Sequence, residues 1–390
     1  MQLTPRMRLL LAGAGVALIG LFVVAGMLLA GTSTGNQPSP TPSAPGTLAP
    51  SPSPTAVPTP TPTPMPTPTP IPTAHPTPAP VGFCPYNGLP VYDASVLDRP
   101  AMLVQVENNP IGRPTSGLNS ADMVVEAPVE GDTTRFGPVY LCSDAPASIG
   151  PVRSARYYDV DLWRQLHAMI MHFGAGWAVL GEFDATGMPY VNGISGAWSF
   201  YARIGPRAAP HNVYFNLQAA REAAAAGRFG YRVARAGEPR APFAFDAGVT
   251  YPAGRAAGEV RIYTNSYWNF GWNWDGSSTS WVRDEDGTWA VDALTGSPLR
   301  AKTVVVQRVS ETILPNELDP GGNPRRRQHM VGSGAGVLLA DGRAFDIRWS
   351  RPSNGALTAF TYADTGEPVV LAPGRVWWEI VPVWSSITEN

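Results

Sequence analysis

Residues 121–142 read ADMVVEAPVEGDTTRFGPVYLC and predict a β-hairpin. Apolar and acidic side chains alternate along the first half, a period of two residues that is typical of a strand with one buried face. The apolar ones are Met123, Val125, Ala127 and Val129, and the acidic ones opposite them are Asp122, Glu126 and Glu130. Gly131 and Asp132 form the predicted turn, and RFGPVYLC returns as the second strand. The stretch therefore predicts a half-buried hairpin in the first folded region.

The segments around this hairpin mix helix and strand. AMLVQVE (residues 101–107) and AMIMHFG (168–174) are short apolar runs that predict buried strands. Helical spacing in YYDVDLWRQL (157–166) predicts a short helix, and the alanine-rich NLQAAREAAAAGRFG (216–230) predicts another that glycine ends. We therefore expect a mixed α/β domain over residues 81–236.

The second half of the folded part has few good helix formers and several Asp-Gly turns. TSWVRDEDGTWAV (279–291) and LLADGRAFDIRW (338–349) each predict a hairpin. Further strands are expected in KTVVVQRV (302–309), PVVLA (368–372) and VWWEIVPV (376–383). We therefore predict an α+β fold, in which a β-rich antiparallel domain over residues 237–390 follows the mixed domain.

The N-terminal region predicts a membrane anchor and a stalk. Residues 9–30 form a run of 22 without charge or proline, which as a helix would span roughly 33 Å, enough for a bilayer core. Arg6 and Arg8 precede it, which favours a cytoplasmic segment 1–8. The alternative is a cleaved signal peptide. Residues 31–80 form a disordered Pro/Thr/Ser-rich linker, with 18 prolines among residues 37–80.

Composition and cysteine content restrict the function further. Arg6 and Arg8 are the only charged side chains before residue 81. The folded part therefore contains 26 of the 28 basic residues and all 30 acidic ones, which gives it a net charge of −4. This balance argues against a nucleic-acid partner. Cys84 and Cys142 predict a disulfide in an oxidising compartment, with two free buried thiols as the alternative. Their spacing gives no metal site, and no cofactor is expected.

Charged and polar residues gather at predicted strand ends and turns of the first domain. The candidates for ligand binding are Arg113, Glu130, Arg135, Arg153, Ser154, Arg156, His172, His211 and Asn212. The segment 169–183 predicts a strand, a Gly-x-Gly loop and a helix, whose N-terminus favours anions. Arginine forks near it would complete an anion site. The alternative is a structural ion network that includes Glu126 and Asp161.

Two stretches of the second half have alternative interpretations. In WNFGWNW the aromatic side chains of Trp268, Phe270, Trp272 and Trp274 share one face of a predicted strand. Such a face either stacks on sugar rings or belongs to the core, and burial is the more common outcome. RRRQH (325–329) is expected as a solvated loop or a phosphate-binding patch.

Several motifs of the first domain resemble the YerB-like family of bacterial extracytoplasmic proteins, which are often lipoproteins. They lie at residues 108–118 (NNP-x-x-RPTSGL), 121–126 (ADMVVE), 130–136 (EGDTTRF) and 150–156 (GPVRSAR). APHN, which ends at Asn212, also resembles the family pattern. The resemblance implies an α+β domain followed by a β-rich domain, and it implies no defined activity. Here an apolar run and stalk replace the lipidated cysteine of the family.

Three functions follow as hypotheses for a single-pass membrane protein with its folded domains outside the cell. The favoured one is binding of an anionic or glycan ligand of the cell envelope through an arginine-rich cleft. The second is a hydrolase with Ser154 as nucleophile, His172 or His211 as base and Asp161 or Glu130 as orienting group. No G-x-S-x-G motif surrounds Ser154, so catalysis is disfavoured. The third is a protein-interaction module that uses Trp272 and Trp274, with no partner identified.

Overall fold

The structure is a computed structural model that describes residues 78–143, 147–196, 199–264 and 269–390. The predicted segments 1–8 and 9–30, and all but the last three residues of the linker 31–80, lie outside the described residues. Within the described ranges, every helix is too short or too polar to cross a bilayer.

The described chain is mostly β-sheet with few helices. A central sheet of twelve strands has the order β12 (Arg255–Ala256), β22 (Arg343–Arg351), β21 (Gly332–Ala340), β18 (Thr303–Val309), β25 (Val376–Pro382), β5 (Met123–Val129), β6 (Thr133–Tyr140), β3 (Ala101–Val104), β7 (Ala168–His172) and β8 (Tyr190–Asn192), with β23 (Ala359–Tyr362) beside β22 and β4 (Val106–Glu107) beside β6. A second sheet contains β16 (Thr288–Trp289), β15 (Ser280–Glu285), β14 (Asn269–Asp275), β13 (Glu259–Tyr263) and β26 (Ser386–Glu389), with β17 (Arg300–Ala301) beside β15.

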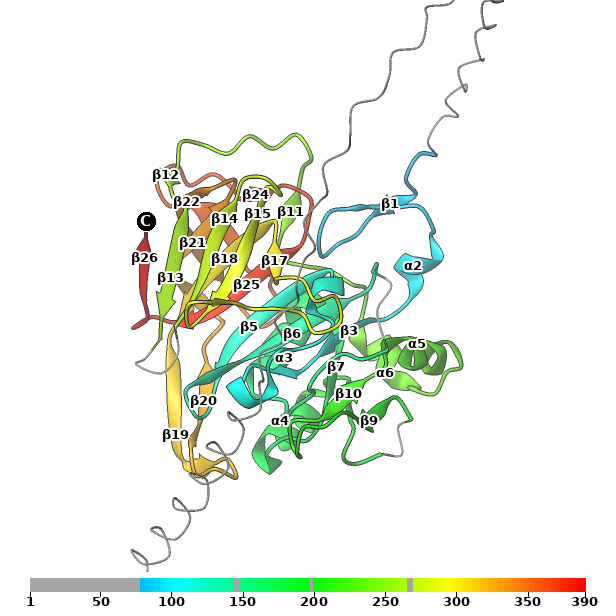
Figure 1. The fold of residues 1–390 in the computed structure, drawn as a ribbon. Helices are drawn as coiled ribbons and strands as arrows, with labels where there is room; N and C mark the ends of the chain where they lie inside the picture. Colours follow the sequence, from blue (N-terminus) through cyan, green and yellow to red (C-terminus); the bar gives the residue numbers. More distant parts are fainter. Residues whose placement is uncertain (1–77, 144–146, 197–198, 265–268) are drawn as a thin grey trace, which may run out of the picture. The chain divides into compact units, whose positions relative to one another are not determined.

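Shorter pairs and helices complete the fold. The two-stranded pairs are β1 (Gly82–Phe83) with β2 (Pro90–Val91), β9 (Tyr201–Arg203) with β10 (Val213–Phe215), β11 (Ala244–Phe245) with β24 (Val370–Leu371), and the ribbon β19 (Glu311–Leu318) with β20 (Pro324–Gln328). The helices are α2 (Ser95–Asp98), α3 (Tyr158–Leu166), α4 (Trp177–Thr186), α5 (Leu217–Ala225) and α6 (Tyr231–Ala236). Figure 1 shows α3 to α6 around the β3–β7 end of the central sheet, while its other end carries strands alone.

The central sheet joins the two halves of the chain. β25 pairs in parallel with β18 on one side and with β5 on the other. The predicted boundary between residues 236 and 237 falls directly after α6, and strands from both sides of it share this sheet. All seven residues of β25 are buried, as expected for a strand covered on both faces.

Most of the local predictions are confirmed. β5 and β6 form the predicted hairpin, with Glu126 opposite Phe136, and α3, α4 and α5 lie where helices are expected. The Asp-Gly hairpins are the pairs β15–β16 and β21–β22. The prediction that β5 is half-buried is wrong, because all seven residues are buried. The acidic residue at its centre, Glu126, is buried in an ion pair with Arg283 of the second sheet.

For the aromatic stretch 268–274 and the arginine run 325–329, the structure contradicts one of the two predicted roles. In β14, Phe270 and Trp272 are fully buried, and Trp272 packs edge-on against Trp377 at a centroid distance of 5.0 Å. Phe270 and Trp272 are therefore core, and sugar stacking or partner docking on Trp272 is excluded because its ring has no exposed surface. Trp274 is half-buried and packs against Trp281 at a centroid distance of 5.4 Å. Trp268 lies outside the described residues. Residues 324–328 form strand β20, so the prediction of a solvated loop there is wrong.

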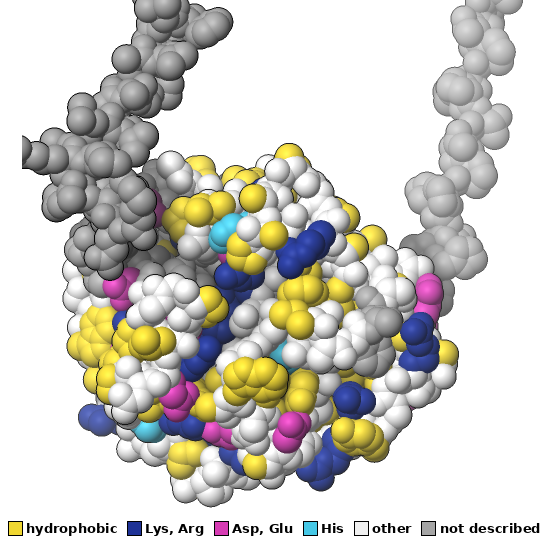
Figure 2. Space-filling view, turned by 90° about the horizontal axis from the view of Figure 1, so that it is seen from below, with side chains coloured by type: hydrophobic (Ala, Val, Ile, Leu, Met, Phe, Trp, Pro, Cys, Tyr) yellow, Lys and Arg dark blue, Asp and Glu magenta, His cyan; other side chains and the backbone are white. Residues whose placement is uncertain are grey.

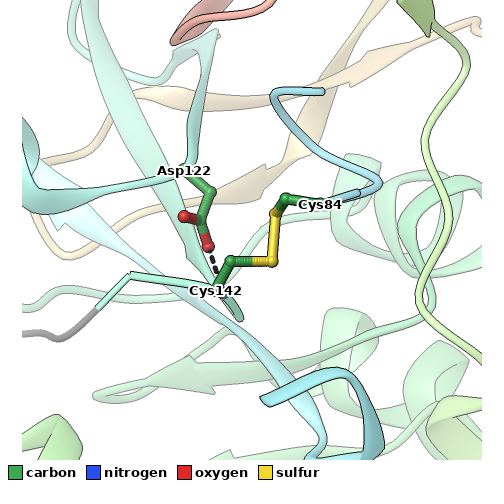
Figure 3. A group of neighbouring side chains, drawn as sticks. All are labelled: Cys84, Asp122 and Cys142. Carbon is green, nitrogen blue, oxygen red and sulfur yellow. Dashed lines mark hydrogen bonds between the residues drawn. A yellow bond between two sulfur atoms is a disulfide. The ribbon is translucent and has the colours of Figure 1, made fainter. Parts of the chain in front are cut away.

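The predicted disulfide is present and closes the start of the folded part onto the end of β6. Cys84 and Cys142 are bonded, with their Cα atoms 6.1 Å apart. Figure 3 shows Asp122 beside this bond, with its carboxylate directed to the backbone of Cys142. Asp122 also accepts the N–H groups of Leu141 and Ser143, at 2.6 and 3.0 Å. Because the sulfurs are bonded to each other and the carboxylate caps backbone groups, this cluster is structural.

Candidate functional site

A cavity of about 220 Å³ opens where the β5–β6 turn, the β19–β20 ribbon and the segment 153–156 meet. The charged residues that line it are Glu107, Glu130, Arg135, Arg153, Arg156 and Asp319. We refer to it as the arginine cavity. Figure 2 shows the face that carries the ribbon, with Lys and Arg side chains along a hollow and hydrophobic side chains on both sides of it.

The segment with Arg153 and Arg156 is held in place by backbone pairing on two sides. The Arg153 N–H donates to Gln105 O at 2.8 Å, and Arg153 O accepts from Phe173 N at 2.9 Å. Ala155 N donates to Gly174 O at 3.0 Å. The segment is thus fixed between the β3–β4 edge and the end of β7, and its two arginines project from a rigid backbone.

Glu130 organises one wall of the cavity. Its Oε2 accepts from Arg156 Nε and lies equally close to Nη2, at 2.5 Å in both cases. Its Oε1 accepts from Arg325 Nη1 at 3.2 Å. A carboxylate that bonds two guanidinium groups in this way fixes the orientation of both. Glu130 therefore joins the segment 153–156 to the β19–β20 ribbon.

Glu107 organises the opposite wall. Its carboxylate lies 2.9 Å from His211 Nδ1 and 3.7 Å from Arg153 Nη1. That Arg153 nitrogen is buried and makes no hydrogen bond among the described residues. Arg153 therefore has hydrogen-bonding capacity to spare on the cavity side.

Arg135 is the least compensated charge of the site. Only 5% of the residue is exposed, and no carboxylate of the described ranges forms an ion pair with it. One Nη1 hydrogen bond goes to Ser154 O, while Nε is buried without a partner. Burial, with repulsion from Arg156, lowers the pKa of Arg135 to about 9. A buried guanidinium that lacks a counter-ion is costly unless an anion compensates it.

The local charge balance is positive. Four guanidinium groups, of Arg135, Arg153, Arg156 and Arg325, surround three carboxylates, those of Glu107, Glu130 and Asp319. Asp319 is occupied by its own turn, where it accepts from the N–H groups of Gly321 and Asn323 at 2.8 Å each. The arrangement favours a small anion such as a phosphate or a carboxylate.

The structure brings some of the predicted ligand residues together and separates others. Glu130, Arg135, Arg153 and Arg156 line the arginine cavity. The carbonyl oxygen of Ser154 accepts a hydrogen bond from Arg156, and His211 contacts and orients the carboxylate of Glu107. Arg113 lies elsewhere: it pairs with Glu285 at 2.8 Å and lines a separate cavity of about 340 Å³. Asn212 accepts from Arg203 Nη1 at 2.7 Å.

The three predicted catalytic residues have separate partners. Ser154 Oγ lies 3.4 Å from Phe173 O, and Asp161 pairs with Arg351 at 2.7 Å. His172 is fully buried, and its Nδ1–H donates to Gly174 O at 2.8 Å. Burial lowers the pKa of His172 to about 4. Asp161 therefore does not orient His172, and the three side chains do not form a triad.

Sequence reasoning missed Glu107 and Asp319, and it placed Arg325 in a loop. Arg325 belongs to the site because β20 runs beside the β5–β6 turn. The cluster of three arginines was a signal for anion binding, but its position beside Glu130 depends on a contact across 195 residues.

The protein thus has a β-rich fold in which both halves of the chain share one sheet, and it carries an arginine-lined cavity. Residues 86–231 match the family described as "Protein of unknown function (DUF3048) N-terminal domain", and residues 259–378 match its C-terminal domain. The chain belongs to this YerB-like family, as the motifs predicted.

A relative that matches by sequence and by structure supports the assignment. The chain is 29% identical over 300 residues to "Putative lipoprotein YerB" of Bacillus subtilis (strain 168), which covers 76% of this chain and 86% of that protein. It also resembles the crystal structure of the Bacillus subtilis YerB protein, with a TM-score of 0.65, 27% identity, and 79% of this chain and 99% of that chain covered.

Proposed function

We propose that this protein binds an anionic ligand of the bacterial cell envelope in the arginine cavity. The observation that carries the proposal is Arg135, a guanidinium that is 5% exposed and has no carboxylate partner among the described residues. Arg153 adds a second unsatisfied nitrogen on the same cavity. An anion that accepts from both would supply the hydrogen bonds that these two nitrogens lack and a counter-ion for Arg135.

The proposal includes membrane association outside the cytoplasm. The Bacillus subtilis relative is described as a lipoprotein, and the disulfide between Cys84 and Cys142 suits an oxidising compartment. The apolar residues 9–30 would supply the anchor in place of a lipid. Cell fractionation with antibody detection tests this part, and an intact chain in the cytosolic fraction would contradict it.

Titration of the full chain with inorganic phosphate, followed by calorimetry, tests the binding. We expect Arg135→Gln and Arg153→Ala to weaken phosphate binding at least tenfold, because one charged hydrogen bond is worth about 1.5–3 kcal/mol. Arg300→Ala is the matched control, since Arg300 pairs with Asp275 outside the cavity. Circular dichroism verifies that each variant is folded. Absence of phosphate binding by the wild-type chain would overturn the proposal.

A further inference from the structure

A second hollow has a volume of about 320 Å³. It is lined by two aromatic rings, those of Phe173 and Tyr201, together with Gly193, Ala202 and Arg203. Phe173 and Tyr201 are half-buried, so each ring keeps part of its surface accessible. Nothing in the proposed anion site uses this hollow, which we refer to as the aromatic hollow.

A backbone contact links one lining residue of each concavity, Arg153 and Phe173. Phe173 N donates to Arg153 O at 2.9 Å, so the residue that supplies the ring is paired with the residue that supplies the cavity guanidinium. Arg203 extends the positive surface, because its guanidinium carbon lies 5.3 Å from the centre of the Phe173 ring. Burial lowers the pKa of Arg153, the carboxylate of Glu107 opposes this shift, and the positive charges of Arg156 and Arg203 add to it.

The shape of the aromatic hollow depends on a glycine. A Cβ atom at Gly193 would lie 2.5 Å from Phe173 Cδ2 and 2.9 Å from Tyr201 Cγ, so a side chain there would collide with both rings. The ring centroids of Phe173 and Tyr201 are 6.0 Å apart. The adjacent backbone is fixed by Asn192, whose Oδ1 accepts from Gly174 N at 2.9 Å and Ile194 N at 3.0 Å. The backbone beside the two rings is therefore held in place at Gly174 and Ile194.

The chemistry of this hollow fits one face of a sugar ring. An aromatic face carries negative charge density and attracts the weakly positive C–H groups of a pyranose. Arg203 at the rim supplies hydrogen-bond donors for ring hydroxyl groups. We infer that the aromatic hollow is a sugar-ring subsite, and that the ligand of the arginine cavity is an anionic glycan that spans both concavities. This inference rests on the proposed function and adds the class of ligand.

The test compares three probes on the full chain: inorganic phosphate, a neutral chitin hexasaccharide, and a hyaluronan hexasaccharide with a carboxylate on every second ring. We expect the hyaluronan fragment to bind at least tenfold more tightly than either other probe. Phe173→Ala should weaken hyaluronan binding at least fivefold and leave phosphate binding unchanged. Arg153→Ala should weaken both.

A second pair of variants addresses the same point without touching the core. Ala202 is exposed at the rim of the hollow, so neither Ala202→Glu nor the matched Ala202→Gln should affect folding. The added carboxylate should reduce hyaluronan binding at least fivefold relative to the glutamine variant. Equal affinity for hyaluronan and phosphate, or no effect of either Phe173→Ala or Ala202→Glu, would overturn the sugar subsite while the anion site stands. Loss of all phosphate binding in the wild type would instead overturn the anion site itself.

Discussion

Arg283 and Glu126 form an ion pair of 2.8 Å between the two sheets, and both side chains are almost completely buried. Arg283 also contacts Glu379 at 2.9 Å and Glu285 at 3.3 Å. Its guanidinium carbon lies 4.2 Å from the centre of the Phe270 ring. One arginine thus holds β5, β15 and β25 together, and removing it leaves the carboxylates of Glu126 and Glu379 without a cation, whereas Glu285 keeps its pair with Arg113.

Arg283→Met should destabilise the fold by about 3–5 kcal/mol, because breaking a buried pair strands its partners in a low-dielectric environment. Chemical denaturation measures the loss. Arg300→Met serves as the control, since its pair with Asp275 is partly exposed and should contribute at most about 1 kcal/mol. Equal losses in the two variants would show that the buried network is not a stabilising element.

His172 predicts a pH-dependent stability. Burial lowers the pKa of His172 to about 4, below the ordinary value of 6.5, so the unfolded chain binds the proton more readily than the native one in this interval. The stability contribution is complete above pH 6.5 and is lost as pH falls toward 4. His172→Leu should remove this dependence, which amounts to about 3 kcal/mol over the interval. Denaturation curves of both chains at several pH values test it, and parallel pH profiles would contradict it.

Asp159 predicts the opposite slope. Burial raises the pKa of Asp159 to about 7 from 3.8, so the native protein holds the proton over that interval and becomes less stable as pH rises through 7. Asp159→Asn resembles the protonated form. We expect the variant to gain stability relative to the wild type between pH 4 and pH 8. A constant difference across this range would mean that Asp159 is ionised in the native state.

The disulfide should stabilise the folded part through the entropy of the unfolded chain. Cys84 and Cys142 are 58 residues apart, and a loop of that length corresponds to about 4 kcal/mol in the chain-entropy model. The double variant Cys84→Ala, Cys142→Ala should lose up to this amount in chemical denaturation. Reduction of the wild type should give a comparable loss, and no change after reduction would contradict the prediction.

Glu107→Gln separates ligand binding from stability. The carboxylate of Glu107 lies 3.7 Å from Arg153, so it competes with an incoming anion for that guanidinium. We expect phosphate to bind several-fold more tightly to the variant, while the free energy of unfolding falls because the 2.9 Å contact between His211 Nδ1 and the carboxylate of residue 107 is weakened. A parallel decrease of affinity and stability would indicate a purely structural network.

Local sequence patterns predicted the elements that depend on residues close together in the chain. The β5–β6 hairpin and α3 follow from short periodicities and turn residues, and both are present. The burial of β5 on both faces was not predictable, because its acidic face is neutralised by Arg283, 157 residues away in the chain. The sequence of β20 suggested a loop because the carboxylate that pairs with Arg325, that of Glu130, lies 195 residues away in the chain.

The candidate site shows the same division. Arg135, Arg153 and Arg156 could be grouped from the sequence because they follow neighbouring predicted strands, and all three line one cavity. Arg113 belongs with Glu285 of the second sheet, a partner that no local pattern indicates. The role of Arg325 depends on how the ribbon packs against the β5–β6 turn, and a single sequence carries no signal for that.

The position of β25 also bears on biogenesis. β25 (residues 376–382) is the last strand of the central sheet in chain order, yet it lies between β18 and β5. A chain delivered from its N-terminus thus exposes the hydrogen-bonding edge of β5 until β25 has been delivered, and open strand edges invite self-association. Maturation of this protein therefore requires delivery as far as β25 before its central sheet can close, and loss of this one strand should separate β18 from β5.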